Sequence, residues 1–200
     1  MQLLYMLLSV TMNNTIKQQL IESIGVKQRA IETLVDPISE AASLFIETLR
    51  SGHVIFLAGN GGSAADAQHI AGELVGRFLK ERKAFPAVSL ATDTSILTAL
   101  ANDYGVEKMF SRQLEALGKD GDLFVAISTS GNSKNILSAV MQAKSIGMRT
   151  IALTGNDGGK LKEMVDLAVV APSESTPRIQ ELHITIGHII CGLAENTLLE

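Results

Sequence analysis

The sequence predicts an α/β fold: a three-layer sandwich with a five-stranded parallel sheet flanked by helices, preceded by extra N-terminal helices. Two observations predict it. Five short apolar runs are continuous rather than alternating, which indicates strands covered on both faces. Each of the first four runs is followed by a polar or glycine-containing turn and then by a helical pattern. The five runs are Val54–Ala58, Ala87–Ala91, Leu123–Ser128, Thr150–Thr154 and Leu167–Ala171.

Helical patterns fill the segments between these runs. We expect two helices within residues 13–51, with a break near Asp36–Pro37. Apolar periodicity then predicts later helices at 63–80, 94–101, 106–118, 133–147 and 176–199. A chain of 200 residues is the usual size of one domain, and no linker or repeat divides it. We therefore expect a single domain over residues 13–200.

Residues 1–12 form an apolar leader, MQLLYMLLSVTM. It lacks the basic start and the cleavage site of a signal peptide, and it is too short to span a membrane. We expect Met12 to be the natural start, with the leader as an extension that is not native. The alternative is an extra apolar turn packed at a subunit interface.

Charge and cysteine content narrow the function classes. The net charge is −4, the pI is about 5.6 and no basic run is present. Nucleic acid is disfavoured as the main ligand, because binding a phosphate backbone needs clustered Lys and Arg. Cys191 is the single cysteine, so no internal disulfide can form and nothing indicates an oxidising compartment. We expect a cytoplasmic protein that binds neither nucleic acid nor membrane.

A glycine-rich turn, G-N-G-G-S, follows the first apolar run and opens a helical pattern. Backbone N–H groups and a helix N-terminus can receive an anion there. The turn lacks the Lys of a P-loop and the G-x-G-x-x-G spacing of a dinucleotide site, so a nucleotide is disfavoured. We expect the glycines to let the chain approach a small polar ligand closely.

A second loop, I-S-T-S-G-N-S, ends the run Leu123–Ser128 and opens the next helix. Its hydroxyls and backbone N–H groups converge on a positive helix N-terminus, as a phosphate monoester requires. Capping alone needs a single hydroxyl, whereas this loop has four within six residues. The loop therefore predicts a phosphate site formed by Ser128, Thr129, Ser130 and Ser133.

His69 and Glu73 lie about 40° apart around the predicted helix after the glycine turn, on one face. They can share a metal ion or divide acid and base work; Arg77, one turn later, pairs with Glu73 or contacts substrate. In the last helix, Gln180 lies about 60° from His183 and about 80° from His188. This spacing alone does not choose between the two histidines. Asn102–Asp103, just past a helical run, is a turn signal in its own right.

Five motifs together resemble the phosphoheptose isomerases of the sugar isomerase (SIS) fold: G-N-G-G-S-A-A-D-A-Q-H-I-A-G-E-L, A-N-D-Y-G, I-S-T-S-G-N-S, L-T-G-N-D-G-G and R-I-Q-E-L-H-I-T-I-G-H-I-I. The resemblance covers about residue 13 to the end. It implies that the four hydroxyl residues hold the sugar phosphate. The sugar would be lined by Asn60, Gly61, Gly62, Asn102 and Asp103, together with Glu73 and Gln180.

The same resemblance implies one zinc ion per site, bound by His69, Glu73, Gln180 and His188. Glu73 would act as the base and His188 as the acid, while His183 would be structural. The family also implies a homotetramer whose active sites combine residues from neighbouring subunits.

The implied reaction converts sedoheptulose 7-phosphate to D-glycero-D-manno-heptose 7-phosphate through an enediol, which supplies the heptose of lipopolysaccharide. One alternative is a non-enzymatic SIS protein that binds the bacterial replication initiator, a branch without the acid at the position of Glu73 and without the final histidine. A transcriptional sugar-phosphate sensor would need a basic helix-turn-helix, but only four Lys or Arg precede residue 52. An arabinose 5-phosphate isomerase of the same fold resembles the chain less at the His/Glu pair.

Overall fold

The computed structural model describes the backbone of residues 2–199 and the side chains of residues 11–199. Most of the leader's side chains lie outside the described residues, so its status stays a prediction. The helices are α1 Gln2–Thr33, α2 Val35–Arg50, α3 Gly62–Val75, α4 Thr94–Tyr104, α5 Ser111–Leu117, α6 Lys134–Ile146, α7 Gly159–Met164 and α8 Thr176–Leu198, with a 3-10 turn, η1, at Val106–Lys108. The strands are β1 Ile55–Ala58, β2 Ala87–Ser89, β3 Leu123–Ser128, β4 Arg149–Thr154 and β5 Leu167–Val170.

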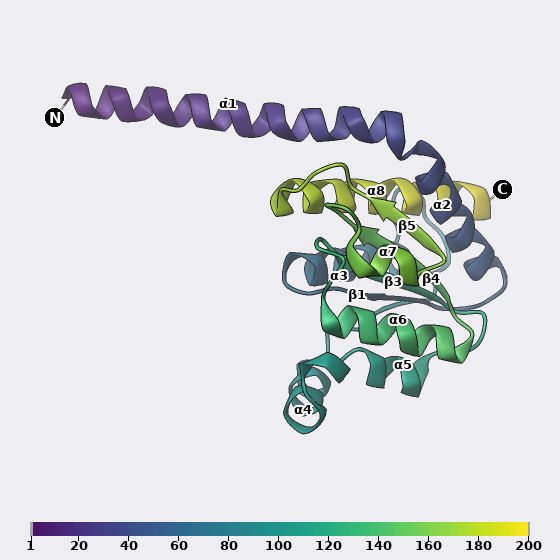
Figure 1. The fold of residues 1–200 in the computed structure, drawn as a ribbon. Helices are drawn as coiled ribbons and strands as arrows, with labels where there is room; N and C mark the ends of the chain where they lie inside the picture. The colour runs from purple at the N-terminus through teal and green to yellow at the C-terminus, as the bar shows by residue number, and fades with distance from the viewer. Residues whose placement is uncertain (1, 200) are drawn as a thin grey trace.

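The five strands form one parallel sheet in the order β2-β1-β3-β4-β5, which confirms the predicted fold class. Alternate residues of the central strands enter two separate cores. Leu123, Val125 and Ile127 pack with α2, α3 and α8, whereas Phe124 and Ala126 pack with α5, α6 and α7. Figure 1 shows the two helical layers on either side of the sheet. Burial on both faces explains why the strands read as continuous apolar runs.

The strand order sets the place where a ligand can bind. From β1 the chain first moves outward to β2, then returns to β3 and continues in the opposite direction. The loops after β1 and β3 therefore diverge to opposite faces and leave a crevice at the carboxyl ends of these neighbouring strands. Ligands of doubly wound sheets bind at such a switch point. The loop after β1 is the glycine-rich turn G-N-G-G-S, and the loop after β3 is I-S-T-S-G-N-S. We call them the glycine turn and the serine loop.

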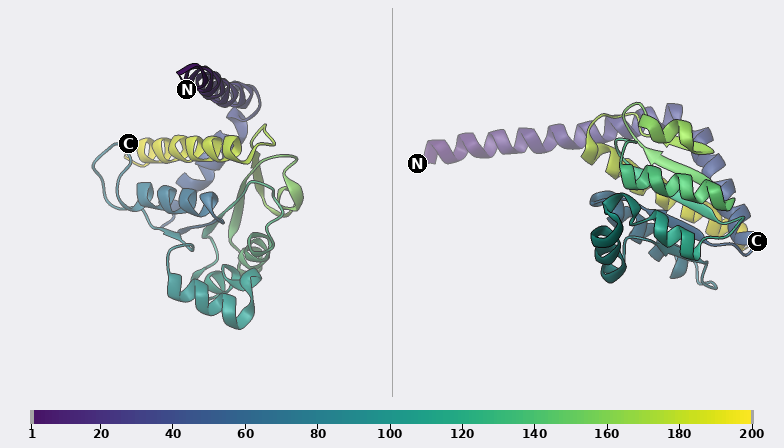
Figure 2. Two further views of the ribbon diagram at one scale, coloured as in Figure 1. Left: turned by 90° about the vertical axis from the view of Figure 1, so that its left-hand side faces the viewer. Right: turned by 60° about the horizontal axis from the view of Figure 1, so that its bottom comes forward.

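Helix α1 extends well beyond the body of the molecule (Figures 1 and 2). Three contacts attach its second half: Arg178 Nη1 donates to the Gln19 carbonyl at 2.6 Å, the Ser23 hydroxyl donates to the Glu181 carboxylate at 2.7 Å, and Arg29 donates to the Pro172 carbonyl. Among residues 2–199, no helix combines the length and the apolarity that a membrane span needs.

Several predicted boundaries shift for identifiable reasons. The break between α1 and α2 falls at Leu34, and Pro37 lies in the first turn of α2, where its missing N–H has no intrahelical role. The helix predicted at 106–118 divides because Lys108 and Met109 donate to carbonyls three residues back, forming η1 before α5 begins. Helix α7 was not predicted, because it has only six residues and begins at a glycine pair typical of a turn.

Candidate active site between α3 and α8

Helices α3 and α8 lie side by side and run in the same direction on one face of the sheet. Two glycines allow the close approach. A Cβ at Gly62, the start of α3, would overlap the Gln180 amide, and a Cβ at Gly187 would lie 2.7 Å from Ile70 Cδ1. Because the two helices are parallel, residues later in α3 contact residues later in α8. This packing brings His188 to the level of His69 and Glu73.

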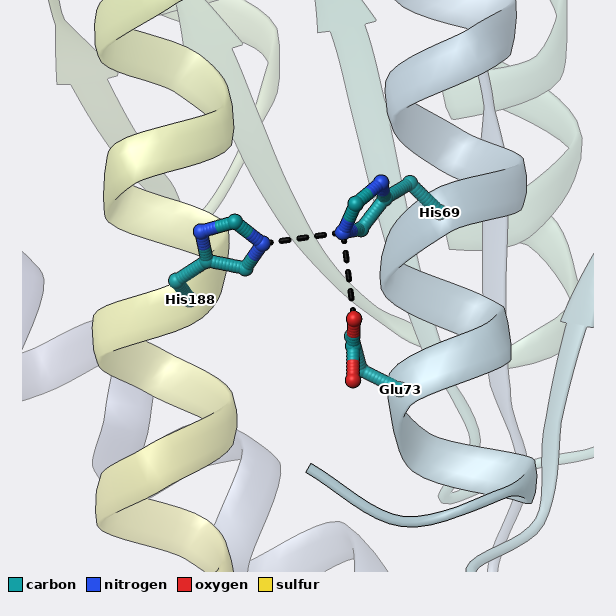
Figure 3. A group of neighbouring side chains, drawn as sticks. All are labelled: His69, Glu73 and His188. Carbon is teal, nitrogen blue, oxygen red and sulfur yellow. Dashed lines mark hydrogen bonds and ion pairs between the residues drawn. The ribbon is translucent and has the colours of Figure 1, made fainter. Parts of the chain in front are cut away.

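His69, Glu73 and His188 converge on one point between the two helices, as Figure 3 shows. His69 Nε2 lies 2.9 Å from His188 Nε2 and 3.1 Å from Glu73 Oε1. One N–H of His69 cannot satisfy both neighbours, because a ring nitrogen carries at most one proton. The site is half open to solvent, with the His69 side chain 47% exposed and that of Glu73 24% exposed. A substrate can therefore reach these groups.

The chemistry of this donor set suits a metal ion. The three ligand atoms all lie within 4.8 Å of one another. Two imidazoles and a carboxylate are preferred zinc ligands, and a tetrahedral ion with ligands at about 2.1 Å separates them by about 3.4 Å. Separations of 2.9 and 3.1 Å at His69 are close to that value, so small side-chain rotations would accommodate an ion. A metal ion would also bind the three groups together, which a single N–H of His69 cannot do.

A groove of about 400 Å³ lies between the first turns of α3 and α8. Gln180, predicted as a ligand, lines it together with Asp66 and Glu181. Asp66 Oδ2 is buried and has no hydrogen-bond partner among the described residues. Burial raises the pKa of the Asp66 carboxyl to about 6, although the nearby His69 opposes the shift. The sequence analysis did not single out Asp66, whose signal is its place one turn before His69 on the same helix.

The glycine turn and the serine loop are joined by a reciprocal amide pair. Asn60 Nδ2 donates to Asn135 Oδ1 at 2.9 Å, and Asn135 Nδ2 donates to Asn60 Oδ1 at 2.8 Å. Asn135 is buried, and its Oδ1 also accepts from the backbone N–H of Ile136. The pair spans the crevice between the ends of β1 and β3, so it fixes the two ligand loops relative to each other. Sequence reasoning missed Asn135, which reads there as an ordinary helical residue.

The serine loop places its hydroxyls at the start of α6. The Ser128 hydroxyl donates to Ser133 Oγ at 3.0 Å, and Ser130 Oγ accepts from the backbone N–H of Asn132. Gly131 adopts φ +62°, and a Cβ there would overlap the Gly158 carbonyl, so this turn requires glycine. Ser133 is the N-cap residue but makes no side-chain capping bond, which leaves first-turn N–H groups of α6 for an anion.

Asn102 and Asp103 lie away from both groups. They sit inside α4 rather than past a helix end, both are exposed, and the Asn102 amide donates to the Asp103 carboxylate at 2.8 Å. Figures 1 and 2 show α4 at the opposite end of the molecule from α8. Their predicted contact with the sugar therefore requires a loop movement or a neighbouring chain, and it stays a prediction.

The two histidines of α8 occupy different environments. His183 is fully buried, and its Nε2 donates to the Thr154 carbonyl at 2.9 Å. Burial lowers the pKa of His183 to about 4, although the Thr154 carbonyl opposes the shift. His188 instead faces α3, where it meets His69 and Glu73. Arg77, which sequence spacing allowed to pair with Glu73, lies 3.6 Å from Glu81.

Fold and site together define a doubly wound α/β protein in which His69, Glu73 and His188, a trio that could hold a metal ion, meet between two helices on one face of the sheet. Comparison with known proteins agrees. The SIS domain family model matches residues 20–155. Phosphoheptose isomerases from Sulfurimonas denitrificans and Aneurinibacillus thermoaerophilus are 53% and 52% identical over 189 residues, 94% of this chain and 97% and 96% of theirs.

Solved structures give the same result. The phosphoheptose isomerase of Neisseria gonorrhoeae aligns with a TM-score of 0.89 at 45% identity, covering 92% of this chain and 99% of that chain. The Francisella tularensis structure aligns with the same TM-score at 36% identity, covering 92% and 97%. The chain therefore belongs to the phosphoheptose isomerase family of SIS-domain proteins, and it is an isomerase.

Proposed function

We propose that the protein interconverts sedoheptulose 7-phosphate and D-glycero-D-manno-heptose 7-phosphate in the cytoplasm, as a step toward the heptose of lipopolysaccharide. The observation that carries the proposal is the meeting of Glu73 and His188, from two different helices, at one open point beside His69. Relatives that share half of the residues over nearly the whole chain are named for the phosphoheptose reaction.

Ketose-to-aldose isomerisation moves one proton from C1 to C2. Glu73 would remove the C1 proton, and an acidic N–H of His188 would protonate the C2 oxygen, which gives the enediol. Glu73 would then return its proton to C2, while His188 takes the proton of the O1 hydroxyl as the C1 aldehyde forms. Glu73 suits this work because Oε1 faces His69, which leaves Oε2 for the proton.

A zinc ion fits the ligand atoms of His69, Glu73 and His188, and we propose Gln180, whose amide lies beside Gly62 at the start of α3, as the fourth ligand. When bound, zinc would polarise the substrate oxygens and stabilise negative charge on them. The side chain of His69, which contacts both groups, would hold the imidazole of His188 and the carboxylate of Glu73 opposite each other. Ser128, Thr129, Ser130 and Ser133 would bind the phosphate, while Asn60, Gly61 and Gly62 line the sugar near the sheet edge.

A homotetramer with shared sites is supported by the surface of α1. Apolar side chains that recur every four or seven residues are exposed along it: Met12, Ile16, Leu20, Ile24 and Ile31. A row of this kind on a projecting helix is typical of an interface. Shared sites are further supported by the length of α3, because Glu73 lies about 16 Å along the helix from its start at the sheet edge. A neighbouring chain can supply Asn102, Asp103 or its serine loop to the Glu73 carboxylate, which lies far from the serine loop of its own chain.

The test is turnover of sedoheptulose 7-phosphate by zinc-loaded and chelator-stripped protein, compared side by side. We expect activity to fall on stripping and to return with zinc. Glu73→Gln should abolish turnover while leaving the oligomer intact, and Glu81→Gln, eight residues away at a side chain that is 91% exposed, should leave turnover unchanged. A well-folded protein without turnover in either metal state would refute the proposal, and turnover by Glu73→Gln would remove that residue from the base role.

A further inference from the structure

Residues 76–86 connect α3 to β2 without regular secondary structure, yet a buried ion pair holds their conformation. Arg82 Nε lies 3.0 Å from Glu195 Oε2, and the two side chains are 1% and 2% exposed. Sequence analysis expected a helix as far as residue 80, whereas α3 ends at Val75. A buried ion pair is retained only where its remaining hydrogen-bonding groups are satisfied. Both partners meet this condition.

The Glu195 carboxylate accepts three consecutive backbone N–H groups of the connection, those of Phe78, Leu79 and Lys80, at 3.0, 2.8 and 2.6 Å. Burial alone would raise the pKa of Glu195, but these bonds and Arg82 outweigh it and hold the pKa below its usual value. The carboxylate thus stays ionised and serves as the anchor around which the chain turns.

Arg82 binds the other side of the connection. Its Nη2 donates to the Glu73 carbonyl at 2.8 Å and its Nη1 to the Leu74 carbonyl at 2.9 Å. These are among the last four carbonyls of α3, which have no partner within the helix. A guanidinium at this end also complements the negative pole of the helix. The ion pair therefore fixes the backbone of Glu73.

The same connection reaches His188. The Phe78 ring stacks on the His188 imidazole, with ring centroids 5.6 Å apart and planes inclined by 25°. Gly192, one turn after His188, makes room for this ring, since a Cβ there would lie 3.2 Å from Phe78 Cε1. His188 and Glu195 are seven residues apart, two helical turns, so one face of α8 presents both. Phe78 is thereby held at its backbone by Glu195 and at its ring against His188.

We propose that Phe78, anchored by the Arg82–Glu195 ion pair, is a positioning residue that fixes the imidazole of His188 opposite Glu73. An imidazole on a helix surface can rotate about two side-chain bonds, and a flat ring stacked on it removes most of those orientations. The inference rests on the proposed function in so far as His188 and Glu73 are the reacting groups. Partners that orient a ligating histidine change metal affinity or activity by about 10- to 100-fold when mutated.

The test uses Phe78→Leu, which keeps an apolar contact with α8 but removes the flat ring, because loss of buried Glu195 can unfold the protein. We expect kcat and zinc affinity each to fall by about 10- to 100-fold. We expect KM to change less than about twofold, because Phe78 does not line the sugar loops. Phe78→Tyr keeps the ring and should restore both quantities. Leu79→Ala, at the neighbouring side chain that is 74% exposed, is the matched control and should resemble wild type.

Zinc affinity is measured by competition with a chromophoric chelator, without substrate, and crystal structures of wild type and Phe78→Leu report the rotamer of His188. Wild-type zinc affinity with an unchanged rotamer in Phe78→Leu would overturn the inference. A wild-type protein without isomerase turnover would instead refute the proposed function. In that case the zinc affinity and the rotamer still decide whether Phe78 positions His188.

Discussion

His183 makes the stability of this protein depend on pH in a way that can be worked from its environment. Its Nε2 must carry the proton, because it donates to a carbonyl, and Nδ1 is buried without a partner among the described residues. Burial lowers the pKa of His183 from 6.5 to about 4. Between these two values the unfolded chain binds a proton that the folded protein does not, so stability is lost as pH falls through this window.

The magnitude follows from the shift. A difference of about 2.5 pKa units corresponds to about 3 kcal/mol at 1.36 kcal/mol per unit. His183→Gln supplies the reference, since a Gln amide can donate to the Thr154 carbonyl and does not titrate in this range. We expect the stability of wild type minus that of His183→Gln to fall by about 3 kcal/mol between pH 7 and pH 4.

Urea unfolding at fixed protein concentration, measured at half-unit steps of pH for both proteins, provides the data. Carboxylates also titrate toward pH 4, but they contribute equally to both proteins and cancel in the difference. A difference that stays constant within about 0.5 kcal/mol from pH 7 to pH 4 would refute the reasoning, because it would mean that folded His183 accepts a proton as readily as the unfolded chain.

Three further changes test other parts of the structure. Glu195→Gln should lower the free energy of unfolding by about 3–5 kcal/mol, because it leaves Arg82 buried without its counter-ion; urea unfolding checks this, and a loss below about 1 kcal/mol would contradict it. Asp66→Asn should stabilise the chelator-treated protein by about 1 kcal/mol at pH 8, because burial raises the pKa of the Asp66 carboxyl from 3.8 to about 6 and this group is only partly buried. The gain should vanish toward about pH 3, below both pKa values, where wild-type Asp66 is protonated in the folded and in the unfolded protein, and an equal gain at both pH values would be the contrary result. Asn135→Ala should raise KM for the sugar phosphate roughly tenfold, because it removes both hydrogen bonds that join the two loops, and steady-state kinetics with unchanged KM would speak against it.

Much of the fold could be predicted because the strands are buried on both faces. Each predicted apolar run overlaps an observed strand, and β3 coincides with its predicted range. The connections were less predictable. The helix expected at 63–80 ends at Val75 because Glu195, more than a hundred residues later, binds the backbone N–H groups of Phe78 to Lys80. Local periodicity carries no signal of a partner so distant in sequence.

The candidate site shows the same division. His69 and Glu73 were predictable as a pair, since a helix places residues four apart on one face. The third member was not, because helical angles alone allow Gln180 to associate with either histidine of α8. That choice depends on which face of α8 meets the core, and the buried His183 shows that a polar residue can lie on that face. Only the family resemblance favoured His188.

A polar residue on a buried helical row is itself a signal that sequence reasoning can use. Glu195 follows Ile190, Cys191 and Ala194, all buried, so its carboxylate is carried into the interior by the helix. An ionised carboxylate there requires a partner. Arg82 is that partner, and its distance along the chain hides it from any local pattern. An acidic residue at an apolar position therefore predicts that a buried cation exists, but not which one.

The contact between Gly187 and Ile70 explains why the ligand trio can form within one chain. Helices whose side chains interdigitate pack with axes 8–10 Å apart, and the imidazoles of His69 and His188 are short enough to need a close approach. At Gly187 the absence of a Cβ lets Ile70 lie directly against the α8 backbone. Because His188 is the next residue, the helices approach each other closely beside the point where the two imidazoles meet. The geometry of the trio is thus set by packing in the core beside it, which α3 and α8 share with the sheet.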